Sequence, residues 1–318
     1  MSAGVPAAWS RQMTVWAALA TSAVCLPALA LPVWPLAVQS AVLVVAVATL
    51  GLPHGAVDHL QARALLRPRS GRFWVAVFAG LYLGAAALVV AAWVHAPPLV
   101  LSAFLALAAV HFGAEDVTSA AISPRQRPGL RVGEGLIRGA LPIAGPVAGH
   151  PGDTGRLFAV LLPEQSADQV VALTAAAASP ATACLVAALG LAALAAIRRQ
   201  WAVAAELLIL TVVLWYLAPL IGFVVYFCFW HAPRHTLRVV AARSEGPLRQ
   251  GLRWFIAEAW PITALTIALG AGAAWFVDAQ TATHAALRLV FVGLAALTVP
   301  HVGLGAWSAA AQTMRRRP

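Results

Sequence analysis

The sequence predicts an all-α protein that crosses a membrane many times as one helix bundle. Of its 318 residues, 61% are hydrophobic and only 10% are charged, and the mean hydropathy is +0.83. Soluble globular chains carry about 25% charged residues. The apolar runs follow one another without a polar block between them. We therefore expect a single integral membrane domain over residues 1–318.

The apolar runs predict about ten transmembrane helices, because a bilayer core takes about 20 apolar residues per helix. The expected spans are 13–31, 36–60, 73–94, 99–118, 133–150, 169–197, 201–218, 220–240, 254–277 and 285–309. Prolines interrupt the stretch 133–180, where residues 169–178 are a candidate for a separate interfacial helix. Residues 1–12 and 310–318 are then the terminal tails, with the first span read as uncleaved.

Arginine predicts the orientation, since loops rich in Lys and Arg stay in the cytoplasm. All 21 basic residues are arginine. Seventeen fall in every second loop or at the termini, namely Arg11, Arg63, Arg67, Arg69, Arg72, Arg125, Arg127, Arg131, Arg198, Arg199, Arg238, Arg243, Arg249, Arg253, Arg315, Arg316 and Arg317. The opposite loops hold only Arg156. We expect both termini, including the basic C-terminal tail, in the cytoplasm.

The basic composition and the cysteines each exclude a class of protein. The arginines form no patch interleaved with aromatic residues, so the isoelectric point near 11.3 does not indicate nucleic-acid binding. Cys25, Cys184 and Cys228 all lie inside apolar segments. They are expected to be reduced packing residues rather than a disulfide framework.

Histidines recur at a similar expected depth on spans two, four, eight and ten. These residues are His54, His111, the pair His231 and His235, and His301. Side chains four residues apart share a helix face, and neutral imidazole is a common metal ligand. The alternative for each histidine is a hydrogen bond between helices. Recurrence on four helices favours a metal site. Four ligands would leave up to two positions open on a six-coordinate metal, as oxygen activation requires.

Further residues are candidates for the surroundings of this site. Carboxylates expected to accept hydrogen bonds from the metal-bound imidazoles are Asp58, Glu115, Asp116, Glu206 and Glu258; the alternative is that they reach the membrane surface. His59 and His301 remain open as additional ligands, whereas His95, His150 and His284 fall at outer loop ends. The aromatic residues around the histidines suit the wall of a tunnel for a long apolar molecule or ordinary packing, and they are Phe112, Phe223, Tyr226, Phe227, Phe229 and Trp230.

Four motifs of the chain resemble the Brp/Blh family of integral-membrane β-carotene 15,15′-dioxygenases. They are residues 51–58 (GLPHGAVD), 111–116 (HFGAED), 226–235 (YFCFWHAPRH) and 290–301 (VFVGLAALTVPH). The resemblance implies that His54, His111, His231 and His235 bind Fe(2+), and that Asp58, Asp116, Glu206 and His301 surround this site. It implies that β-carotene and O2 react to give two retinals in the bacterial cytoplasmic membrane. A rhodopsin is a possible acceptor of the retinal.

Other functions compete with this interpretation. The main alternative is a catalytically silent carotenoid- or retinal-binding protein that acts as an accessory or a transporter. A haem-binding electron carrier would need axial ligands on opposite sides of the haem, which a His-x-x-x-His pair on one face does not provide. The His-His pairs of di-iron desaturases and the His-Glu-x-x-His motif of zinc proteases are both absent from the sequence.

Overall fold

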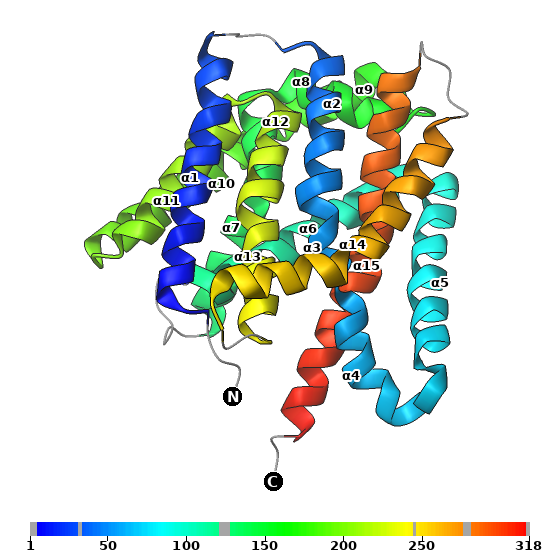
Figure 1. The fold of residues 1–318 in the computed structure, drawn as a ribbon. Helices are drawn as coiled ribbons and strands as arrows, with labels where there is room; N and C mark the ends of the chain where they lie inside the picture. Colours follow the sequence, from blue (N-terminus) through cyan, green and yellow to red (C-terminus); the bar gives the residue numbers. More distant parts are fainter. Residues whose placement is uncertain (1–4, 31–33, 121–127, 244–245, 276–280, 316–318) are drawn as a thin grey trace. The chain divides into compact units, whose positions relative to one another are not determined.

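The computed structural model describes residues 5–30, 34–120, 128–243, 246–275 and 281–315, and every regular element within these ranges is a helix (Figure 1). The prediction of an all-α chain is confirmed. Arg125, Arg127, Arg316 and Arg317, which entered the orientation argument, lie outside the described residues.

By length and composition, five helical stretches are apolar enough to cross a membrane, as expected for a membrane protein. They are Leu36–His95, Pro97–Thr118, Ala167–Ile197, Leu248–Ala274 and Ala282–Ala311. The count of about ten spans and the position of the termini stay predictions.

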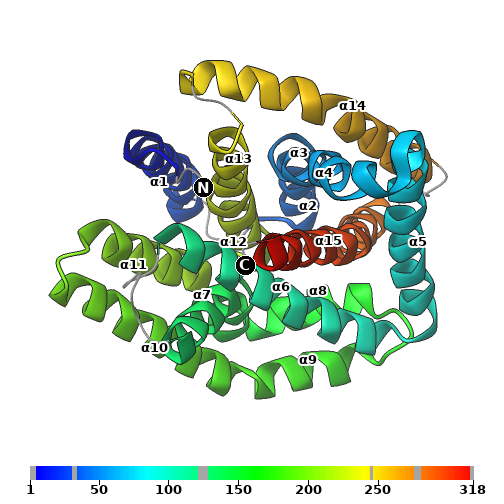
Figure 2. The same cartoon turned by 90° about the horizontal axis from the view of Figure 1, so that it is seen from below.

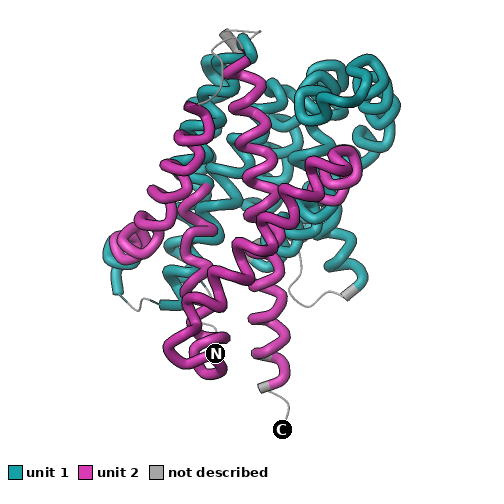
Figure 3. The backbone as a smooth tube through the Cα atoms, turned by 90° about the vertical axis from the view of Figure 1, so that its right-hand side faces the viewer, with its two compact units in different colours: residues 1–51, 105–251 teal, residues 52–104, 252–318 magenta. Residues whose placement is uncertain are grey.

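The chain divides into two compact units, residues 1–51 with 105–251 and residues 52–104 with 252–318 (Figure 3). The elements wholly within unit 1 are α1 (Ala7–Ala30), α2 (Leu36–Ala46), the π-helix η1 (Val47–Gly51), α7 (Pro128–Gly149), α8 (Pro151–Leu161), α9 (Ala167–Ala176), α10 (Ala178–Ile197), α11 (Trp201–Tyr216), α12 (Pro219–Val224), the π-helix η3 (Val225–His231) and α13 (Ala232–Ala241). Those wholly within unit 2 are α3 (Leu52–Gly55), α4 (Asp58–Ser70), the 3-10 helix η2 (Gly71–Phe73), α5 (Trp74–His95) and α15 (Ala282–Arg315). Helices α6 (Pro97–Ala120) and α14 (Leu248–Ala274) contribute residues to both units.

Unit 1 is built on helices α7, α10 and α11, which pack against one another (Figure 2). Ala144, Val147 and Ala181 form a small buried cluster there. Helices α6 and α7 approach closely through glycine. A Cβ at Gly139 would lie 1.8 Å from the carbonyl oxygen of Ala109, so the two backbones are in contact.

Unit 2 is organised around α15, which packs against α4 and α5. Its core contains Ala62, Leu65, Leu66 and Leu304, with Trp307 packed against them. The guanidinium of Arg69 lies 5.9 Å from the ring centroid of Trp307, so α4 and α15 are joined at the rim of this core as well.

Several expected spans are interrupted in the structure. The span 220–240 consists of α12, η3 and α13, and the span 36–60 contains α2, η1, α3 and the start of α4. The span 169–197 is divided at Ala177 into α9 and α10, in line with the alternative of a separate helix at 169–178. Helices α1 and α15 also extend into the expected tails, to Ala7 and Arg315. The single membrane domain stays a prediction.

The glycine contact between α6 and α7 gives a stability prediction. Gly139→Ala should destabilise the fold by about 1–3 kcal/mol, because the methyl group would meet backbone that cannot move aside alone. The measurement is thermal or denaturant unfolding of the purified chain in detergent. Gly133→Ala is the matched control on the same helix, since its Cβ would meet open space; an equal effect of both substitutions would contradict the close contact.

Candidate functional site

The structure brings two of the predicted metal-binding histidines of unit 1 together. His111 comes from α6 and His231 from the end of η3, and their ring centroids are 5.2 Å apart at an interplanar angle of 71°. His231 and His235 are buried, whereas His111 is half-buried. The Nδ1 atom of His235 lies 3.6 Å from Oε2 of Glu115, which also pairs with Arg238. Glu115 therefore lies beside a predicted ligand, His235, as expected.

His231 is the last residue of the π-helix η3, and the proline two residues later explains why this helix forms. Pro233 has no N–H to offer to the carbonyl four residues earlier. The backbone N–H of Ala232 bonds instead to the carbonyl of Phe227, five residues before it. A second π-helix, η1, ends just before Pro53 and His54. Short π-helices are frequent at functional sites; here η1 ends three residues before His54, and η3 ends at His231.

Flat rings surround His231 within unit 1. The rings of Phe223 and Phe227 stack at 5.3 Å, and Phe227 stacks on His231 at 5.9 Å. Phe112 meets the edge of His231 at 4.6 Å. The wider turn of the π-helix also brings Tyr226, five residues earlier, to within 6.3 Å of His231. A Cβ at Gly51 would lie 2.6 Å from Phe227, so only glycine leaves room for this ring.

The other two aromatic residues of the predicted tunnel wall pack against α1. The indole N–H of Trp230 donates to Oγ1 of Thr21 at 3.1 Å, and both residues are buried. The ring of Phe229 meets that of Trp16 edge-on at 5.8 Å. Packing therefore accounts for the direction of Phe229 and Trp230, while the remaining four aromatic residues lie around His231.

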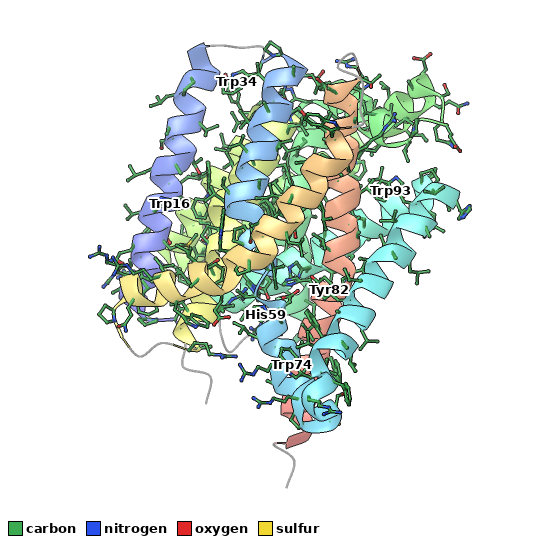
Figure 4. All side chains as sticks on the ribbon, turned by 45° about the vertical axis from the view of Figure 1, so that its right-hand side comes forward. Trp16, Trp34, His59, Trp74, Tyr82 and Trp93 are labelled. Carbon is green, nitrogen blue, oxygen red and sulfur yellow. The ribbon has the colours of Figure 1, made fainter. Side chains whose placement is uncertain are left out.

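Unit 2 contains a second group of predicted site residues. The rings of His54 and His301 are 5.5 Å apart, and Nδ1 of His301 lies 2.9 Å from both carboxylate oxygens of Asp58. Tyr82, which Figure 4 labels on α5, donates from its hydroxyl to Asp58 at 3.0 Å. Asp58 is buried. This carboxylate therefore orients the ring of His301.

The structure also shows the surroundings of His59 and of the three histidines expected at outer loop ends. Nε2 of His59 lies 3.3 Å from Glu258, and its Nδ1 lies 3.1 Å from the carbonyl oxygen of Ala56. His95 and His284 are exposed, as expected. His150, in contrast, is half-buried, and its Nε2 bonds to the carbonyl of Tyr216 at 2.9 Å, so it connects two helices.

A buried network of charges runs through unit 1, and sequence reasoning found only part of it. Asp116 accepts hydrogen bonds from Tyr226 at 3.0 Å and from Arg234 at 3.2 Å. Arg234 also donates to Glu206. Beyond Glu206 the network continues through Arg138, 3.5 Å away, to Glu134, which Arg138 contacts at 2.9 Å. All five ionic residues of this network are buried.

Glu134, Arg138, Arg234 and Tyr82 were not among the predicted site residues. The pair Glu134 and Arg138 carried a usable signal, because opposite charges four residues apart inside an apolar span form a pair on one helix face. Arg234 lies within the motif of residues 226–235, but it falls inside the expected span 220–240 and so gave no signal in the arginine pattern of the loops. Tyr82 gave no signal, because a single tyrosine in an apolar helix is compatible with packing alone.

The candidate histidines approach one another in two pairs, and imidazole is a side chain that binds metal ions. The ring centroids of His111 and His231 are 5.2 Å apart, and those of His54 and His301 are 5.5 Å apart. Within the residues that the structure describes, no three histidine, cysteine, aspartate or glutamate side chains are grouped closely enough to hold a metal ion. The predicted four-histidine set therefore stays a prediction.

Comparison with known proteins gives one family. The family model described as beta-carotene 15,15′-dioxygenase matches residues 45–308, which include all five histidines of the candidate site. The probable beta-carotene 15,15′-dioxygenase Blh of Halobacterium salinarum is 33% identical over 305 residues, covering 83% of each chain. The beta-carotene 15,15′-dioxygenase of the uncultured marine bacterium 66A03 is 27% identical over 257 residues, covering 80% of this chain and 88% of that one. No solved structure matches.

The contact between α1 and η3 predicts that Thr21→Val destabilises the fold by about 1–3 kcal/mol, because the buried indole N–H of Trp230 loses its acceptor. Unfolding of the purified chain in detergent measures this effect. Thr14→Val is the control on the same helix, since the Thr14 hydroxyl donates to the carbonyl of Ser10 in its own helix at an exposed position. A Thr21 variant as stable as the Thr14 variant would contradict the role of this bond.

The group around Asp58 predicts a cost of about 1.5–3 kcal/mol for Tyr82→Phe, since a hydrogen bond to a buried carboxylate is lost. The unfolding midpoint of the purified variant checks this. The exposed Tyr216 provides the control substitution Tyr216→Phe, which should leave stability within about 0.5 kcal/mol of the unmodified chain. Equal midpoints for the two variants would show that Tyr82 does not support Asp58.

Proposed function

Because the chain belongs to the β-carotene 15,15′-dioxygenase family, we propose that it cleaves the central 15,15′ double bond of β-carotene with O2 to give two molecules of retinal. The observation that carries this proposal is the family match over residues 45–308. The relative from Halobacterium salinarum, at 33% identity over 83% of both chains, supports it.

We propose Fe(2+) as the cofactor, with His54, His111, His231 and His235 as its ligands. The approach of His111 and His231 supports this assignment in unit 1, while His54 is assigned from its sequence motif. Imidazole ligands add no negative charge to a site with a low dielectric constant. When bound, ferrous iron supplies the activation of O2, which no side chain of this protein can provide.

The protein's own residues position the reactants and exclude water. The flat rings of Phe112, Phe223 and Phe227 around His231 suit contact with the conjugated chain of β-carotene. A fixed position of the 15,15′ bond beside the imidazoles converts the reaction into an intramolecular one. The apolar surroundings keep water from reactive intermediates. No side chain acts as a nucleophile.

We also propose a multi-pass arrangement in the bacterial cytoplasmic membrane, with about ten spans and both termini in the cytoplasm. The five long apolar helices and the distribution of arginines support it. β-Carotene is soluble only in lipid, so it would enter from the bilayer. Retinal would return to the bilayer or pass to a rhodopsin.

The test is chromatography of extracts from β-carotene-producing bacteria that express the chain. The unmodified chain should give retinal, and His231→Ala should reduce retinal at least 100-fold, to the background of cells without the chain, because a proposed ligand is lost. His95→Ala replaces an exposed histidine and should retain retinal formation.

Other products would change the proposal in defined ways. Apocarotenals of other lengths would contradict cleavage at the 15,15′ bond. Intact β-carotene together with folded, iron-containing protein would contradict the enzyme assignment and favour a carotenoid-binding accessory or transport protein.

A further inference from the structure

We propose that Arg234 is a positioning residue: by bridging Asp116 and Glu206, it sets the distance and angle between the imidazoles of His231 and His111 for metal binding. This inference rests on the proposed function, because it assumes that these imidazoles bind iron.

Arg234 joins the segment that carries His231 and His235, formed by η3 and α13, to helices α6 and α11. It follows His231 by three residues and precedes His235 by one. Its guanidinium donates to Oδ1 of Asp116 on α6, at 3.2 Å, and to Oε2 of Glu206 on α11. Any rotation of the paired-histidine helix would break these two contacts.

Asp116 holds the segment on both sides of His231. It lies five residues after His111 on α6, and its two oxygens accept from different residues of the paired-histidine segment. Tyr226, five residues before His231, binds Oδ2, while Arg234 binds Oδ1. A rigid connection therefore runs from His111 along its own helix to Asp116 and across to the π-helix that ends at His231.

The chemistry of arginine explains why this position suits it. Guanidinium is planar, and its N–H groups point in fixed directions, so one side chain can bind two carboxylates at a defined angle. The guanidinium of Arg234 also lies 5.4 Å from the ring centroid of Trp230, which itself bonds to Thr21. A lysine would keep the charge but lose this geometry.

The charges of the network favour a role beyond stability. Buried ion pairs are frequently no more stabilising than apolar residues of the same size, because both charges must be desolvated. In the described part of the chain, the network joins three carboxylates, Asp116, Glu134 and Glu206, through two guanidiniums. It therefore fixes the positions of α6, α7, α11 and α13 relative to one another.

The experiment uses Arg234→Lys in the full chain, purified in detergent and titrated with Co2+ as a spectroscopic probe of the imidazole site. We expect Co2+ affinity to fall 10- to 100-fold and its visible absorption spectrum to change, as is typical when a residue that orients metal ligands is lost. With iron, kcat should fall by a similar factor while KM for β-carotene stays within about twofold. Arg156→Lys is the control, because Arg156 is exposed and pairs with Asp153 in its own helix.

The outcomes separate this inference from the proposed function. If the unmodified chain binds Co2+ and forms retinal, but Arg234→Lys has unchanged affinity and spectrum, Arg234 is only a structural residue and the inference fails. If the unmodified chain binds no metal and forms no retinal, the proposed function fails too.

A second variant decides the matter if Arg234→Lys does not fold. Glu206→Gln removes one of the two carboxylates that Arg234 binds, on a helix that carries no histidine. It should weaken Co2+ binding about tenfold. A folded Glu206→Gln variant with unchanged Co2+ affinity and spectrum would contradict the proposal.

Discussion

A charge inside an apolar helix bundle must find its counter-charge within the protein, and in unit 1 this constraint determines which helices meet. Arg234 binds carboxylates from α6 and α11, and Arg138 extends the same chain of contacts to α7. Removing one partner would leave a buried charge uncompensated, which is far more costly than removing an apolar contact. The paired-histidine segment is therefore held by polar contacts of defined direction, whereas apolar packing alone would allow it to slide.

The backbone must also satisfy its hydrogen-bonding groups within the protein, and this matters at Pro53 and Pro233, which lie beside the histidines. A proline inside a helix leaves one carbonyl without its usual donor, and in a membrane no water replaces it. In η3 the neighbouring N–H bonds shift by one residue, which widens the turn instead of breaking the helix. The wider turn places Tyr226, Phe227 and His231 on one face. Pro300 shows that proline alone is insufficient, because α15 continues through it as an α-helix.

Composition was enough to predict an all-α membrane protein, because hydropathy is a property of whole segments. The recurrence of histidines at a similar expected depth is in line with the approach of His111 to His231, while the meeting of all four proposed ligands stays a prediction. The π-helices could not be predicted, since a shift of one hydrogen bond leaves the apolar pattern almost unchanged. The hydrogen bond between His301 and the carboxylate of Asp58 could not be predicted either, because His54 and Asp58 lie on separate helices, α3 and α4, with a turn between them.

Helix α1 shows that the region shared by a family need not coincide with the unit that folds. The family match begins at residue 45, yet Trp16 and Thr21 contact the residues directly before His231. Transplanting only the shared region into another scaffold would remove Thr21, the acceptor of the indole N–H of Trp230. An ancestral or minimised version of this protein would therefore need a different residue at position 230, so the two positions are expected to change together during evolution.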